Sequence, residues 1–268
     1  MNELFLNQYN IFVKHNDFRK NFPTIIFIHG LSGSMSAWDK YSEQFQDKFN
    51  LVKIDLRGHG KSHKYTQTSE YRISCFSRDL DNIVRHFKIN DPIFISHSFG
   101  CLVLIDYIIR YNITSGKAIF LSARFNLKNI AVDFLSSLLL SIMTVPKYLT
   151  SPSRKIQHIN YNHYPLNTDF DIKRTLADIS NTGLYIYLSC IKHISKLDYQ
   201  KDLINVNIPT LFIHGTQDSI FNIRLIRNIY TRIKYSKLVE VKDANHVMVF
   251  SHPEKLSREI TGFLEGKK

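Results

Sequence analysis

Three short stretches, each at or just after the end of an apolar run, carry residue types that could perform nucleophilic catalysis. Ser98 stands in the stretch SHSFG, Asp218 ends the stretch HGTQD, and His246 ends the stretch DANH. A serine hydroxyl is a weak nucleophile at neutral pH, so it needs an adjacent base, which in turn needs an orienting acid. Twelve histidines compete for the role of base. The residue types therefore indicate the chemistry without choosing every member of the site.

The elements that must position these stretches are short apolar runs separated by longer segments with apolar residues near helical spacing. This pattern is typical of parallel strands buried on both faces and connected by helices. The expected strands span residues 24–28, 51–54, 93–95, 118–121, 210–213 and 238–241, after a hairpin of residues 4–6 and 11–13. The expected helices span residues 35–49, 77–87, 98–111, 223–233 and 253–264. We therefore expect an α/β fold with a mostly parallel central sheet of about eight strands and helices on both faces.

The alternation of strands and helices breaks between residues 121 and 209. This stretch is too long for a loop inside a compact domain. We expect residues 124–202 to form a helical insertion after the sixth strand, while residues 1–123 and 203–268 form the core.

The most apolar part of the insertion, residues 131–149, has apolar side chains on more than one helical face. We expect one face to pack on the core, and the other to line a substrate pocket. The alternative is that this helix packs entirely within the insertion. The candidate pocket residues are Leu139, Ile142, Met143 and Val247.

The stretch around Ser98 has the spacing of a strand that turns sharply into a helix. Such a turn exposes the serine oxygen, and the positions two residues away must be small because the two backbones nearly touch. Gly100 satisfies this fully and Ser96 tolerably. Ser96 is the rival nucleophile, but it lies at the strand end, before the turn. The amides at the start of the helix would also face developing negative charge.

With a strand before it and a helix after it, SHSFG resembles the nucleophile elbow G-x-S-x-G of the α/β-hydrolase superfamily, with serine in place of the first glycine. The stretch HGLSGS followed by Trp38 resembles the H-G-x-x-G-S-x-x-x-W pattern of that superfamily, and residues 55–62, DLRGHGKS, resemble its D-x-R-G-H-G-x-S loop. The stretches that end at Asp218 and His246 resemble its acid and histidine loops. The resemblance covers almost the whole chain outside the insertion, and the insertion stands where this superfamily carries a helical cap.

The resemblance implies that Asp218 is the acid and His246 the base for the serine. Asp243 is a rival acid, but it lies only three residues from His246 and is poorly placed to orient that ring. The family pattern also implies an oxyanion hole made by the backbone amides of Leu31 and Phe99.

The resemblance implies a serine esterase or lipase that cleaves carboxylic esters, with lipophilic acyl groups or small-molecule parts, through an acyl-enzyme. A C–C bond hydrolase, an aminopeptidase and a menaquinone-type synthase of the same fold remain alternatives, as does a non-catalytic ligand-binding member. Serine at position 98 argues against the epoxide hydrolases and haloalkane dehalogenases of the superfamily, which use aspartate there. No metal cluster, P-loop or G-x-G-x-x-G pattern is present, so we expect no metal and no cofactor.

Composition sets the remaining limits. The chain has 268 residues, of which 44% are apolar, enough for a sizeable core. The net charge is +12, but the basic residues are scattered, so we expect no nucleic-acid partner and at most weak attraction to an anionic membrane surface. The longest uncharged apolar stretch, residues 134–146, is shorter than the roughly 20 residues of a spanning helix. Three cysteines without a pairing pattern and the absence of a signal-peptide pattern predict a soluble, cytoplasmic protein. The sequence predicts no particular oligomeric state.

Overall fold

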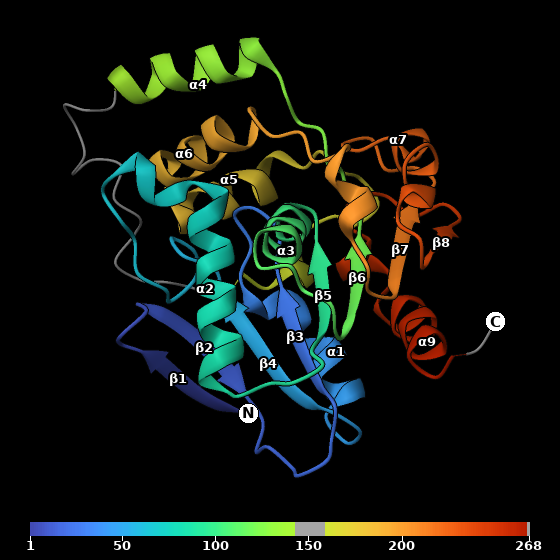
Figure 1. Ribbon diagram of the computed structural model, residues 1–268. Helices are drawn as coiled ribbons and strands as arrows, with labels where there is room; N and C mark the ends of the chain where they lie inside the picture. Colours follow the sequence, from blue (N-terminus) through green and yellow to red (C-terminus); the bar gives the residue numbers. More distant parts are fainter. Residues whose placement is uncertain (143–158, 267–268) are drawn as a thin grey trace.

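A computed structural model describes residues 1–142 and 159–266, and an eight-stranded sheet lies at its centre (Figure 1). The strands are β1 (Asn2–Leu6), β2 (Ile11–His15), β3 (Thr24–Ile28), β4 (Asn50–Asp55), β5 (Ile93–His97), β6 (Lys117–Leu121), β7 (Thr210–Gly215) and β8 (Ser236–Val241). Their order in the sheet is β1-β2-β4-β3-β5-β6-β7-β8. The pairs β1–β2 and β2–β4 are antiparallel, and all the other pairs are parallel. The expected fold class is therefore confirmed.

Helices cover both faces of the sheet because successive strand residues point to opposite faces. In β3, Ile26 and Ile28 belong to one apolar cluster, and Ile25 and Phe27 belong to the other. The first cluster includes side chains of α2 (Ile73–His86), α3 (Phe99–Arg110) and α7 (Ile223–Arg227). The second includes side chains of α1 (Asp39–Phe45), α8 (Met248–Ser251) and α9 (Pro253–Leu264).

Two of the expected helices are shorter than their apolar spacing suggested. The helix expected at residues 35–49 begins as a 3₁₀ turn, η1 (Met35–Trp38), and continues as α1. The helix expected at residues 223–233 ends after α7, and a separate 3₁₀ turn, η5 (Tyr230–Arg232), follows it. Two further 3₁₀ turns are η2 (Thr68–Tyr71) and η4 (Asp202–Asn205).

The long segment between β6 and β7 contains α4 (Ile130–Ile142), η3 (Tyr161–His163), α5 (Ile172–Thr182) and α6 (Leu184–Ile194). These helices lie beyond the carboxyl ends of the parallel strands, and α4 packs on the outer side of α6 (Figure 1). The two ends of the segment run side by side, because the Leu127 amide donates to the Leu197 carbonyl at 3.0 Å and the Tyr199 amide donates to the Phe125 carbonyl at 2.8 Å. This arrangement agrees with a helical insertion at residues 124–202 that covers the sheet edge, and the division into core and cap stays a prediction.

In the two described ranges, every helix is too short or too polar to cross a membrane.

Candidate active site

The turn from β5 into α3 is sharp and strained at Ser98. Its backbone has φ 51° and ψ −113°, with a positive φ that a residue other than glycine adopts at a cost of about 1–3 kcal/mol. The turn is anchored because the Ser98 amide donates to the Leu121 carbonyl at 3.0 Å. A Cβ on Gly100 would lie 2.6 Å from the Ile28 carbonyl oxygen, so the helix approaches β3 as closely as a glycine allows.

The two serines of the stretch SHSFG face different surroundings. Ser96 is fully buried, and its hydroxyl donates to the Ile119 carbonyl of the neighbouring strand at 3.1 Å. The Ser98 hydroxyl instead faces a loop after β8, where it lies 2.9 Å from His246 Nε2. The geometry therefore brings Ser98, and not Ser96, to the histidine named from the sequence.

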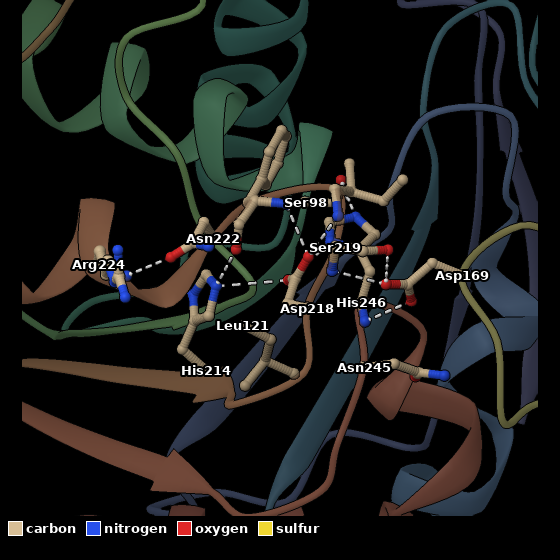
Figure 2. A network of polar contacts seen from close by, with 12 residues as sticks. Ser98, Leu121, Asp169, His214, Asp218, Ser219, Asn222, Arg224, Asn245 and His246 are labelled. Carbon is tan, nitrogen blue, oxygen red and sulfur yellow. Dashed lines mark hydrogen bonds and ion pairs between the residues drawn. The ribbon is translucent and has the colours of Figure 1, made fainter.

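Figure 2 shows a chain of polar contacts from Ser98 through His246 to Asp218. His246 Nδ1 lies 2.9 Å from Asp218 Oδ2, and its Nε2 lies 2.9 Å from Ser98 Oγ. Asp218 follows β7 and His246 follows β8, so neighbouring parallel strands deliver the acid and the base to the same edge of the sheet. The two loops approach so closely that a side chain at Gly215 would overlap the Ala244 carbonyl.

The Asp218 carboxylate is held in its charged form. Its side chain is fully buried, and burial alone would raise its pKa, but hydrogen bonds from His246 and from the Phe221 amide outweigh this effect. The pKa of Asp218 therefore lies below its ordinary value. Its Oδ1 accepts from the amides of Ile220 at 3.0 Å and Phe221 at 2.7 Å, which leaves Oδ2 directed at His246. Asp243, the rival acid, is exposed and accepts from Gln217 at 3.2 Å.

The loop after β3 places Leu31, one of the two expected oxyanion donors, beside the same site. His29 Nε2 lies 3.0 Å from the Leu56 amide, which can only donate, so His29 Nδ1 carries the hydrogen and donates to the Gly30 carbonyl at 2.7 Å. The Gly33 amide donates to the same oxygen at 3.2 Å. Since the C=O and N–H groups of a peptide point in opposite directions, these bonds turn the Leu31 amide away from His29. Burial and nearby His59 lower the pKa of His29 to about 3, so this ring remains a neutral donor.

The second expected oxyanion donor is the Phe99 amide at the start of α3. Within residues 1–142 and 159–266, neither this amide nor that of Leu31 donates a hydrogen bond. Both residues line the cavity above Ser98. Two free amides beside a serine hydroxyl could stabilise an oxyanion, which is the role predicted for them.

A cavity of about 340 Å³ opens over Ser98. Its walls come from the loops of the sheet edge and from α5 and α6 of the insertion, and most of the lining side chains are apolar. The apolar lining residues include Leu102, Leu127, Ile179, Tyr187, Ile191, Ile194, Ile220, Phe221, Val247 and Phe250. Polar side chains enter from the insertion at Asp169, Arg174 and Asp178.

The expected pocket residues fare unequally. Val247 lines the cavity, whereas Leu139 and Ile142 are 39% and 64% exposed and are not among its lining residues. In this structure these two α4 residues therefore do not line the cavity above Ser98. Because α4 turns Ser136 and Leu140 inward and packs on α6, it forms an outer layer. Met143 lies outside the described residues.

The residues of α5 and α6 that line the cavity were not among those expected from the sequence. A signal existed in α6, where Tyr187, Ile191 and Ile194 recur at helical spacing and form one face. Asp169 and Asp178 had no comparable signal, because isolated acidic residues are ordinary on a surface. Within the described residues, no group of three histidine, cysteine or acidic side chains could hold a metal ion.

A family model described as alpha/beta hydrolase fold matches residues 23–253, which include all of the site described above. The chain belongs to this family. Among curated proteins it is 23% identical to 3-oxoadipate enol-lactonase 2 of Acinetobacter baylyi, covering 91% of this chain and 89% of that protein. It is also 23% identical to epoxide hydrolase 1 of Caenorhabditis elegans, covering 90% of this chain and 65% of that protein.

Solved structures of the family share the fold at low sequence identity. A thermophilic esterase from Thermogutta terrifontis superposes with a TM-score of 0.76 at 18% identity, covering 96% of this chain and 94% of that one. The enol-lactonase from Burkholderia xenovorans gives 0.74 at 18% identity, covering 98% of this chain and all of that one. Family membership supports a hydrolase.

Proposed function

We propose that this α/β-hydrolase cleaves small carboxylic esters through an acyl-enzyme on Ser98. The observation that carries the proposal is the pair of 2.9 Å contacts that join Ser98 Oγ to His246 and His246 to Asp218, beside a mostly apolar cavity. A buried acid, an oriented imidazole and a serine at a strained turn have complementary roles in acyl transfer.

Acylation begins when His246 Nε2 takes the proton of Ser98 as the serine oxygen attacks the ester carbonyl carbon. The carbonyl oxygen becomes an oxyanion, which accepts hydrogen bonds from the amides of Leu31 and Phe99. The C–O bond to the alcohol then breaks, and His246 gives its proton to the departing alkoxide. Asp218 stays ionised throughout and stabilises the imidazolium.

Deacylation repeats these steps with water as the nucleophile. His246 takes a proton from the water molecule, the hydroxide oxygen attacks the acyl carbon, and the bond to Ser98 breaks. The proton returns to the serine oxygen, and the carboxylic acid leaves. Each cycle therefore consumes one ester and one water molecule and yields one acid and one alcohol.

The cavity favours substrates of modest size. Its volume of about 340 Å³ lies at the lower end of the 300–1,000 Å³ that is common for small-molecule sites. Burying one methylene of an acyl chain contributes about 0.8 kcal/mol until the space is filled. The enol-lactonase names among the relatives also support cyclic esters as substrates.

Labelling with a fluorophosphonate tests the proposal, followed by hydrolysis of aryl esters of graded acyl length and of an aromatic lactone. We expect the wild type and Ser96→Ala to be labelled, and Ser98→Ala to lose both labelling and turnover while it remains folded. We expect kcat/KM to rise from acetyl to a medium acyl chain and then to fall. Labelling that survives in Ser98→Ala and vanishes in Ser96→Ala would contradict the assignment of the nucleophile. Labelled protein that hydrolyses none of the esters would favour another serine chemistry, and a chemically inert Ser98 would favour a binding protein.

A further inference from the structure

One carboxylate of the insertion contacts both loops that carry the acid and the base. Asp169 lies in the loop before α5, and its Oδ1 accepts from the main-chain amide of His246 at 2.6 Å. Its Oδ2 accepts from the Ser219 amide at 2.8 Å and from the Ser219 hydroxyl at 2.6 Å. Ser219 directly follows Asp218, so a single side chain bridges the two loops of the triad (Figure 2).

The loop that carries Asp169 is itself firmly held. The buried guanidinium of Arg174 donates to the carbonyls of Pro165 at 2.6 Å, Thr168 at 3.0 Å and Asp169 at 2.7 Å. Asp171 caps α5 by accepting from the Arg174 amide at 2.6 Å. Asp169 therefore reaches His246 and Ser219 from a loop whose main chain is held in place by Arg174.

A second contact docks the same loop on the histidine loop. The side-chain amide of Asn245 donates to the Leu166 carbonyl at 3.0 Å. Residues 166 and 169 of the insertion thus contact the two adjacent residues that end the DANH stretch. The position of the base is consequently tied to the docking of the insertion.

Asp169 binds the main-chain amide of His246, so it fixes the point of the backbone from which the imidazole ring extends. A hydrogen bond from an amide to a carboxylate is shorter and stronger than one between neutral groups. The imidazole ring makes two 2.9 Å contacts at once, to Asp218 and to Ser98. It therefore tolerates little movement of its own main chain, because displacements near 1 Å cost up to about a hundredfold in rate.

We propose that Asp169 is a positioning residue that sets the distance between the acid and histidine loops, so that the serine is activated only when the insertion is docked. The inference rests on the proposed function and deepens it. The insertion then has two roles, as a wall of the cavity and as a supplier of one bond that keeps His246 in line with Ser98 and Asp218.

The test compares Asp169→Asn with Asp171→Asn. Both replacements remove one negative charge from the same loop with little change of shape, but the hydrogen bond of the Asp171 side chain is with the Arg174 amide at the start of α5. An asparagine side chain has one oxygen, so in the Asp169→Asn variant it can accept from the main-chain amide of His246 or from that of Ser219, but it cannot bridge these two amides. The readouts are kcat and KM for an aryl acetate and the rate of fluorophosphonate labelling, with circular dichroism to check the fold.

We expect Asp169→Asn to lower kcat between about tenfold and about a hundredfold, with KM within about threefold, and to slow labelling by a similar factor. Asp171→Asn should stay within about threefold of the wild type in all three quantities. Ser219→Ala, which removes one of the three hydrogen bonds, should fall between them, and it serves as the test if Asp169→Asn does not fold.

Equal behaviour of the Asp169→Asn and Asp171→Asn variants would overturn the inference. A rise in KM with unchanged kcat and labelling would also overturn it, because Asp169 would then be a wall residue of the cavity. In both cases the wild type would still be labelled, and the proposed function would stand. A wild-type Ser98 that resists labelling would overturn the proposed function and this inference together.

Discussion

The ring of His97 holds the main chain of His246, with His97 Nε2 and the His246 carbonyl oxygen 2.9 Å apart. The carbonyl can only accept, so Nε2 carries the hydrogen of this ring. The residue directly before Ser98 thus binds the residue that contacts Ser98, and the two imidazole rings lie 5.2 Å apart. Burial and nearby His246 lower the pKa of His97 to about 3, so this link stays neutral.

Acid should destabilise the protein steeply, because several histidines are buried in their neutral form. Burial lowers the pKa of His29 and His97 to about 3 and that of His59 to about 4. Above pH 6.5 both the folded and the unfolded chain hold these rings neutral. Below it the unfolded chain takes up protons that the folded chain refuses, which costs about 1.4 kcal/mol per pH unit for each ring. The free energy of unfolding should fall by about 4 kcal/mol per unit between pH 6 and pH 4 from these three groups.

Urea denaturation at a series of pH values measures this slope. His59→Phe removes one of the three rings, together with a buried nitrogen that has no partner among the described residues. Its slope should be shallower by about a third. A stability that stays level from pH 7 to pH 5 would show that these rings are not buried as neutral groups.

Asp218→Asn should cripple catalysis, whereas Asp243→Asn should leave it nearly unchanged. The amide of asparagine cannot hold the imidazole in the required tautomer, and loss of the analogous group in a serine protease costs about 10⁴ in kcat. Asp243 faces Gln217 at the surface. Steady-state kinetics with one aryl ester checks both variants, and a larger loss in Asp243→Asn would reassign the acid.

Two glycine-to-alanine variants should have opposite effects on stability. A Cβ at Gly100 would meet the carbonyl oxygens of Ile28 at 2.6 Å and His29 at 2.7 Å, which are backbone atoms and cannot give way. We expect Gly100→Ala to destabilise the fold by about 3 kcal/mol or more. Gly262 lies inside α9 with open space around its Cα, so Gly262→Ala should stabilise by about 0.5–1 kcal/mol. Thermal unfolding of the two variants tests the close approach of α3 to β3.

The affinity for neutral esters should weaken above pH 7. Asp178 lines the cavity and accepts from the Tyr161 hydroxyl at 2.8 Å, and burial raises its pKa to about 7, against the effect of the Tyr161 hydrogen bond and of Arg174. As the pH rises through this value, the wall gains a negative charge that a neutral, apolar acyl group cannot compensate. KM for such an ester should rise between pH 6 and pH 8 in the wild type and stay level in Asp178→Asn. A parallel rise in the variant would assign the effect to another group.

The sheet and the turn at Ser98 could be predicted because their signals are local. Most strands are short apolar runs, and the spacing around Ser98 is that of a strand that turns sharply into a helix, whereas Asp218 and His246 were predicted from the resemblance of their loops to those of the family. The prediction of one helix over residues 223–233 was too long, because apolar spacing does not show where a helix ends. In the structure α7 ends with Asn228 as its C-cap.

The cavity could not be predicted in the same way, because its walls depend on the order in which helices stack. The apolar residues of α4 suggested a pocket, but α6 lies between α4 and the core and supplies the wall instead. Asp169 contacts His246 across 77 positions of sequence, and no periodicity records such a contact.

The paired ends of the proposed insertion would suit it to exchange as one segment. Leu127 and Leu197 are already bonded neighbours, so cutting the chain there and joining in a foreign segment would leave the strands and their register untouched. Proteins that share this sheet could in this way exchange the segment, and with it their substrate preference, in a single recombination event. If Asp169 positions His246 as proposed, it limits such exchange, because a transplanted segment without a carboxylate at this place would lose the hydrogen bonds to the His246 and Ser219 amides.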